Sequence, residues 1–166
     1  VEANYSWGKI IKGLVLGTFT IKPLGAFRKL DNRFFILTPP PRLPCRNYFR
    51  LIGIMNQLIL RMYIRRAMGK IGMASPILWT FSHQSDKLIG RFQESLSVYH
   101  CVDYWQWLLP KVFLMGSKTA IKRDEILTSS QVDFVVSTSR FLQGYLKKYN
   151  SRSYYVPNAA EYDLFS

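Results

Sequence analysis

SVYHCVDYW, from Ser97 to Trp105, contains an apolar run of strand type, Ser97–Val102, that ends at the acid Asp103. DFVVSTSRF, from Asp133 to Phe141, contains a second, Asp133–Ser137, that ends at polar residues. PILWTF (Pro76–Phe81) and SYYV (Ser153–Val156) are two more short apolar runs of strand type. Segments with helical spacing separate them, too long for the strands to pair as hairpins. Strands that alternate with helices pair in parallel through right-handed crossovers. The sequence therefore predicts an α/β fold with a mainly parallel sheet.

The connecting segments supply the helices of this fold. Lys118–Ser130 and Arg140–Tyr149 are predicted helices, and Leu88, Ile89 and Phe92 have the spacing of a short one. Because the run from Pro76 to Phe81 is continuously apolar, we expect that strand to be buried on both faces.

The first part of the chain is less regular. Arg33–Leu37 is a predicted strand that stops at Thr38–Pro41, where three prolines prevent a central strand or helix. Asn47–Met68 has helical periodicity, with one narrow polar stripe on an otherwise apolar surface, so we expect it to be mostly covered. Residues 1–32 form a poorly defined N-terminal segment, either the end of a strand with irregular structure or a lid.

Length and composition fit one folded domain. The chain has 166 residues, of which 48% are hydrophobic and 20% charged. The uncharged stretch Ile71–Ser85 is shorter than the roughly 18 residues of a spanning helix. Cys45 and Cys101 are too few for a disulfide framework and read as reduced thiols, as in the cytoplasm. We expect no metal, because His100 and Cys101 would point to opposite faces of a strand.

The positive charge is concentrated in one half of the chain. The net charge is +13, and residues 1–70 hold 13 Lys and Arg against 2 acids. A surface of this kind attracts polyanions, whether an anionic membrane, a phosphate-bearing substrate or a nucleic acid.

Polar side chains follow each predicted strand of the sheet. In open parallel sheets, ligands bind beyond the carboxyl ends of the strands. A rim there would carry His83, Asp103, Tyr104, Trp105, Ser139, Arg140 and Asn158. These residue types suit a polar substrate, and no complete nucleotide-binding, nucleophile-elbow or zinc-protease motif accompanies them.

Each of these residues also has a purely structural interpretation. His83 would bond a loop carbonyl or a helix end, and Asp103 would cap the turn that follows it. Ser139 would cap the helix that begins at Arg140, with or without a bound anion. Trp105 would fill the core rather than stack on a sugar or an acyl chain.

Three ordered segments nevertheless carry a family resemblance. VYHCVDYW (Val98–Trp105), VDFVVSTSRFL (Val132–Leu142) and YYVPNAAEYDLF (Tyr154–Phe165) resemble motifs of bacterial two-domain (GT-B) glycosyltransferases with a family-4-like N-terminal domain, such as those of teichuronic acid biosynthesis. FILTPPP (Phe35–Pro41) and PILWT (Pro76–Thr80) agree with this order. The resemblance implies the N-terminal, Rossmann-like half of that fold, with its first strand before residue 1.

The family gives these positions functions. The resemblance implies that His83 faces the transferred sugar and that Asp103 orients an acceptor hydroxyl or takes its proton. Substrate contacts are expected from Tyr104, Trp105, Ser139, Arg140 and Asn158. The nucleotide-sugar donor would bind a C-terminal domain with paired glutamates, which this sequence lacks, so no cofactor is expected here and the gene should continue. The predicted domains are 33–157, on the acceptor side, and 158–166, the start of the interdomain crossing.

The same family works on sugar or lipid-linked saccharide acceptors, which gives the basic half a meaning. We expect a cytoplasmic protein attached peripherally to the inner face of the membrane, with anionic lipid contacted by Arg46, Arg50, Arg61, Arg65 and Arg66. One alternative is a basic nucleic-acid-binding domain, although no known nucleic-acid fold places its basic residues mainly on one apolar helix. The other is a non-catalytic, standalone module that binds a partner.

Overall fold

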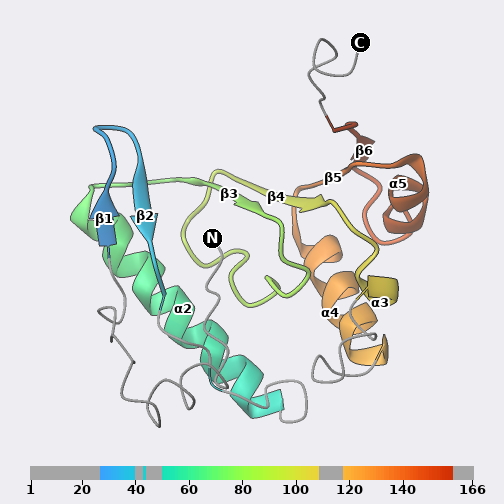
Figure 1. Cartoon of the computed structure of the whole chain (residues 1–166), viewed down its shortest axis with the longest axis horizontal. Coiled ribbons are helices and arrows are strands. Elements are labelled where there is room, and N and C mark those ends of the chain that lie inside the picture. The colour runs from blue at the N-terminus through green and yellow to red at the C-terminus, as the bar shows by residue number, and fades with distance from the viewer. Residues whose placement is uncertain (1–26, 40–42, 44–49, 109–117, 159–166) are drawn as a thin grey trace, which may run out of the picture. The chain divides into compact units, whose positions relative to one another are not determined.

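The structure is a computed structural model that describes residues 27–39, 43, 50–108 and 118–158 (Figure 1). The chain divides into two compact units, Val1–Met73 and Ala74–Ser166, and each is described by itself. This division differs from the predicted domains 33–157 and 158–166, which stay a prediction.

The first unit contains a small antiparallel sheet. β1 (Phe27–Lys29) pairs with β2 (Phe35–Leu37), and the rings of Phe27 and Phe35 stack 5.5 Å apart. The Leu30 amide closes the turn by donating to the Phe34 carbonyl at 2.9 Å. The predicted strand at 33–37 therefore exists, but it belongs to a hairpin with a strand that the sequence had not indicated.

The long helix α2 (Arg50–Lys70) confirms the helix predicted over 47–68. Buried Asn56 holds its N-terminal half, accepting from the Leu43 amide at 2.7 Å and donating to the Leu43 carbonyl at 3.1 Å. The expectation that this helix is mostly covered is wrong for one apolar stripe. Four exposed side chains, spaced four, three and four residues apart along the helix, form this stripe: Leu51, Met55, Leu58 and Met62.

The second unit confirms the α/β fold with a parallel sheet flanked by helices. Its four strands lie in the order β3-β4-β5-β6, and every neighbouring pair is parallel. The strands are β3 (Ile77–Thr80), β4 (Leu96–Cys101), β5 (Phe134–Ser137) and β6 (Ser153–Tyr155). All four lie within one residue of both bounds of the strands predicted at 76–81, 97–102, 133–137 and 153–156.

Helices cover one face of this sheet. α4 (Lys118–Gln131) connects β4 to β5, and α5 (Arg140–Leu146) connects β5 to β6 (Figure 1). Alternate strand residues point to these helices and form the core, which includes Tyr99, Cys101, Val135, Leu142 and Leu146. His100 lies between them on the other face, against the rings of Trp79 and Phe81, as the alternation predicts.

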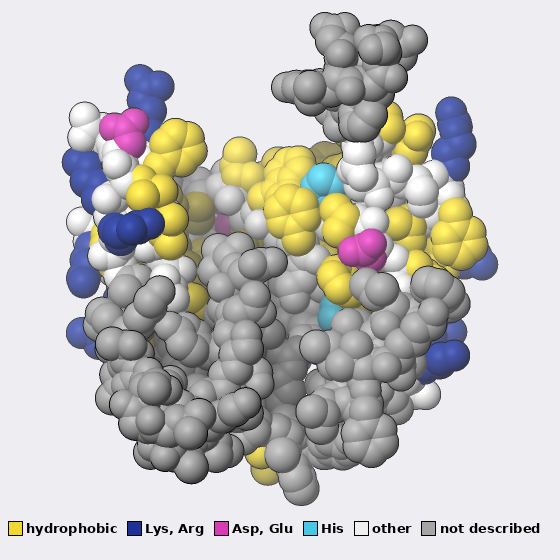
Figure 2. Space-filling model, viewed as in Figure 1, with side chains coloured by type: hydrophobic (Ala, Val, Ile, Leu, Met, Phe, Trp, Pro, Cys, Tyr) yellow, Lys and Arg dark blue, Asp and Glu magenta, His cyan; other side chains and the backbone are white. Residues whose placement is uncertain are grey.

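The prediction that β3 is buried on both faces is wrong. Ile77 and Trp79 are 62% and 50% exposed, whereas Leu78 packs against the core. β3 is an edge strand of the described sheet, and the helices of this unit cover the opposite face. Figure 2 shows hydrophobic side chains gathered over this part of the surface.

The short helix predicted around Leu88, Ile89 and Phe92 is also wrong, because turns connect β3 to β4. The three side chains are buried as their spacing suggested, but Gly90 adopts a φ of 70°, which ends any helix there. The Glu94 carboxylate then accepts hydrogen bonds from the amides of Gly90 and Phe92. Apolar spacing alone did not reveal this break.

Asp133 ties the start of β5 to β4. Its carboxylate accepts from the amide and the hydroxyl of Ser97 at 2.8 and 2.7 Å, and these bonds lower the pKa of Asp133. A lowered pKa in the folded state means that the unfolded chain binds the proton more readily. This stabilisation is present above the usual Asp pKa of about 3.9 and is lost as pH falls through the lower folded value.

We therefore expect Asp133→Asn to flatten the acid side of the stability profile. Urea unfolding of the wild type and the variant between neutral and acidic pH measures this. Ser97→Ala leaves the carboxylate but removes its hydroxyl partner, so it should flatten the profile in the same direction. Wild-type slopes in both variants would contradict the assignment.

Candidate functional site

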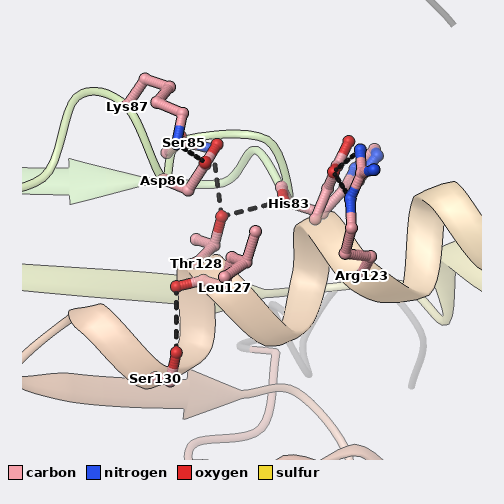
Figure 3. A network of polar contacts seen from close by, with 9 residues as sticks. His83, Ser85, Asp86, Lys87, Arg123, Leu127, Thr128 and Ser130 are labelled. Atoms are coloured by element: carbon pink, nitrogen blue, oxygen red, sulfur yellow. Dashed lines mark hydrogen bonds and ion pairs between the residues drawn. The ribbon is translucent and has the colours of Figure 1, made fainter. Parts of the chain in front are cut away.

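The loop after β3 carries His83 and is held by α4. The Thr128 hydroxyl donates to the His83 carbonyl at 2.9 Å and accepts from the Ser85 amide at 3.1 Å (Figure 3). The Ser85 hydroxyl in turn bonds the Thr80 hydroxyl and the Ser82 carbonyl. The loop is therefore fixed at its base by buried hydrogen bonds, and the His83 side chain is itself buried.

The segment after β4 carries Asp103 and leads into the short helix α3 (Trp105–Leu108). Buried Glu125 of α4 lies beneath it. Its Oε1 atom lies 3.4 Å from the Tyr99 hydroxyl and 3.8 Å from the Cys101 thiol, and its Oε2 atom accepts from Gln106 at 3.1 Å. One carboxyl group thus contacts the chain on both sides of Asp103.

Burial raises the pKa values of the groups in this cluster. It raises the pKa of Glu125 and of Tyr99, and it raises the pKa of Cys101 to about 12. Cys101 is therefore a neutral thiol and not a nucleophile at neutral pH. Its Sγ atom donates to the Asp103 carbonyl at 3.3 Å, which is a structural contact.

The Asp103 side chain is exposed on this rim. Among the described residues its carboxylate accepts no hydrogen bond and forms no ion pair, so it is not the turn cap of the structural interpretation. A carboxylate with open acceptor positions can receive a hydroxyl from a ligand.

The structure brings His83 and Trp105 together. Their ring centroids are 5.1 Å apart with the planes inclined at 34°. Because Trp105 lies only two residues after Asp103, this contact joins the loop after β3 to the segment after β4. Three residues predicted at two strand ends therefore belong to one part of the rim.

Hydrogen bonds join the exit of β5 to the exit of β4. Thr138 donates from its hydroxyl to the Val102 carbonyl at 3.1 Å and from its amide to the Cys101 carbonyl at 3.2 Å. Ser139 then accepts from the Leu142 amide at 3.2 Å, which confirms it as the N-cap of α5.

Two aromatic contacts complete this side of the rim. The exposed Arg140 guanidinium lies over the Tyr155 ring at 5.1 Å. Tyr104 lies edge-on to Phe141 at 5.4 Å, and Phe141 is 65% exposed. The sequence analysis did not select Phe141, because the residue type does not indicate that this side chain is exposed on its helix.

The remaining predicted residues are Asn158 and the arginines of the first unit. Asn158 is exposed after β6. Arg65 and Arg66 are exposed on α2 and Arg61 is half-buried. Arg46 and the side chain of Arg50 lie outside the described residues.

A second concave feature lies elsewhere on this unit. A shallow, polar-lined pocket of about 290 Å³ is formed by residues that include Asp133, Asn150 and Arg152, which precede β5 and β6. None of the predicted site residues lines it. Within the part of the chain that the structure describes, no group of three or more His, Cys, Asp or Glu is arranged to hold a metal, and no helix is long and apolar enough to span a bilayer.

Comparisons with protein-family models, with curated proteins and with solved structures find no match to this chain. The resemblance to glycosyltransferases therefore stays a prediction, and the geometry of the rim carries the functional proposal.

Proposed function

We propose that this chain is the acceptor-binding half of a glycosyltransferase, which transfers a sugar from a nucleotide-sugar donor to a cell-surface polysaccharide or a lipid-linked acceptor. The observation that carries the proposal is the rim at the carboxyl ends of the parallel strands. There the exposed Asp103 carboxylate has no intramolecular partner among the described residues, and it lies two residues before Trp105, whose ring packs against that of His83. The ordered sequence motifs supply the choice of chemistry.

The proposed reaction assigns one proton transfer to this chain. The acceptor hydroxyl oxygen forms a bond to the anomeric carbon of the donor sugar while the bond from that carbon to the nucleotide phosphate oxygen breaks. Asp103 orients the hydroxyl and receives its proton, and the departing phosphate takes the bonding electrons. The donor would be held by the second domain that the resemblance implies.

Acceptor binding tests this proposal without the donor half. The chain contains only two histidines, so their imidazole protons give a simple NMR spectrum. We expect a suitable cell-surface oligosaccharide or lipid-linked saccharide to shift the His83 signals and leave those of His100 unchanged, because only His83 lies on the rim. If saccharides leave both signals unchanged and single-stranded RNA shifts them, the nucleic-acid alternative is favoured.

Peripheral attachment to anionic membranes belongs to the same proposal. α2 contains five Lys and Arg and no acid, and its exposed stripe Leu51–Met62 is continued by exposed Arg65 and Arg66. Figure 2 shows further basic side chains over β1 and β2 of the same unit. An apolar strip beside basic groups suits the interface of an anionic bilayer at the cytoplasmic face.

We expect the chain to bind phosphatidylserine vesicles and to leave them as salt rises, because salt screens the attraction. Replacing Arg65 and Arg66 by Gln should weaken binding about 30-fold, from about 1 kcal/mol per basic residue. Changing exposed Lys147 and Lys148 to Gln removes the same charge elsewhere and should have little effect. Vesicle sedimentation measures both, and equal losses would contradict a role for α2.

A further inference from the structure

We propose that Glu125 and Thr128, three residues apart on α4, position the two loops that carry the candidate site. Residues at this spacing lie on the same face of a helix. Both side chains are fully buried, and each bonds to a different strand exit. The inference rests on the proposed function only where it gives the two loops a role in sugar transfer. The contacts themselves can be tested without sugar transfer.

Thr128 acts on the exit of β3. Its one hydroxyl donates to the His83 carbonyl and accepts from the Ser85 amide, so both sides of Gln84 are bonded to α4 (Figure 3). A buried carbonyl and amide that lose their partner are costly to leave unbonded, which favours the bonded loop over other conformations. The direction of the His83 ring therefore depends on where Thr128 lies.

Glu125 acts on the exit of β4. Its carboxyl group contacts Tyr99 and Cys101 before Asp103, and Gln106 after it. The Gln106 amide also contacts the Tyr145 hydroxyl of α5, so this network includes three helices. A buried carboxyl group is expensive to desolvate, and a core needs no such group when an apolar side chain of similar size would fill the space.

One rigid helix therefore fixes the distance between the two loops. If either anchor is lost, the core can persist while one loop moves relative to the other. The first contact to change would be the packing of His83 against Trp105, which joins the loops. This separates a positioning role from a purely stabilising one, which would alter the whole unit alike.

Proton NMR of the 166-residue chain measures this contact. Trp105 displaces the His83 imidazole resonances by its ring current, and Trp105→Leu defines the spectrum without it. We expect Thr128→Val and Glu125→Leu to lose most of that displacement. Thr128→Ser keeps the hydroxyl and Glu125→Gln keeps a carbonyl acceptor, so both should retain most of it.

His100 serves as an internal reference, because its shifts report the packing of Trp79 and Phe81 on the other face. Ser129→Ala is the matched control, since Ser129 is equally buried on α4 and its hydroxyl bonds only to the Glu125 carbonyl of its own helix. The proposal is overturned if the Val and Leu variants keep the His83 displacement, or if Ser129→Ala loses it too. Loss of the native His100 shifts in both variants also overturns it, because the residues would then hold the core. None of these outcomes depends on whether the protein transfers a sugar.

Discussion

Under the proposed function, Asp103→Asn is expected to reduce the rate of sugar transfer on the order of 10²-fold or more, the usual scale for removal of a general base. Asn has nearly the same shape as Asp but cannot take a proton from an acceptor hydroxyl. Because the Asp103 carboxylate is exposed and has no hydrogen bond or ion pair among the described residues, its loss should hardly change the melting temperature.

The control is the same chemical change at a carboxylate outside the predicted site. Asp124 lies on α4, and among the described residues its carboxylate contacts only Arg123, at 2.9 Å, so Asp124→Asn removes an equal charge without removing a predicted site residue. Initial rates and thermal unfolding of both variants should separate a catalytic from a structural effect. Near-wild-type turnover for Asp103→Asn would remove this residue from the site.

The parallel sheet was predictable because its strands are short and apolar and end at polar residues. All four strands lie within one residue of the apolar runs that predicted them. What the runs could not tell is how many faces a strand buries. An apolar stretch has the same appearance at an edge as at the centre, and β3 lies at an edge with Trp79 half exposed.

The position of the candidate site was predictable from the sequence, but the hydrogen bonds that hold its loops were not. The rule that ligands bind at the carboxyl ends of parallel strands selected His83 and Asp103. Their anchors were overlooked, although Glu125 and Thr128 follow Ile121 at the spacing of one helix face. A polar residue within an apolar stripe is a readable signal, but the sequence does not identify its hydrogen-bond partners.

The packing of α5 on the sheet also indicates where a substitution should destabilise the fold most. Leu146 is fully buried at the end of α5 and belongs to the core with Val135 and Tyr99. The next residues turn back on it, since the amides of Tyr149 and Asn150 both donate to its carbonyl. The surroundings of Leu146 are therefore held from both the sheet and the chain that follows, which limits how far they can collapse into a cavity.

We expect Leu146→Ala to lower the free energy of unfolding by about 2–5 kcal/mol, from lost burial and from the cavity that remains. Phe141→Ala removes a larger side chain from the same helix, but one that is 65% exposed, so its cost should be much smaller. Urea unfolding followed by circular dichroism gives both values. If the two substitutions cost the same, α5 does not cover the sheet through Leu146, and the packing on which the rim depends would have to be different. A large difference would support the packing of α5 on the sheet through Leu146.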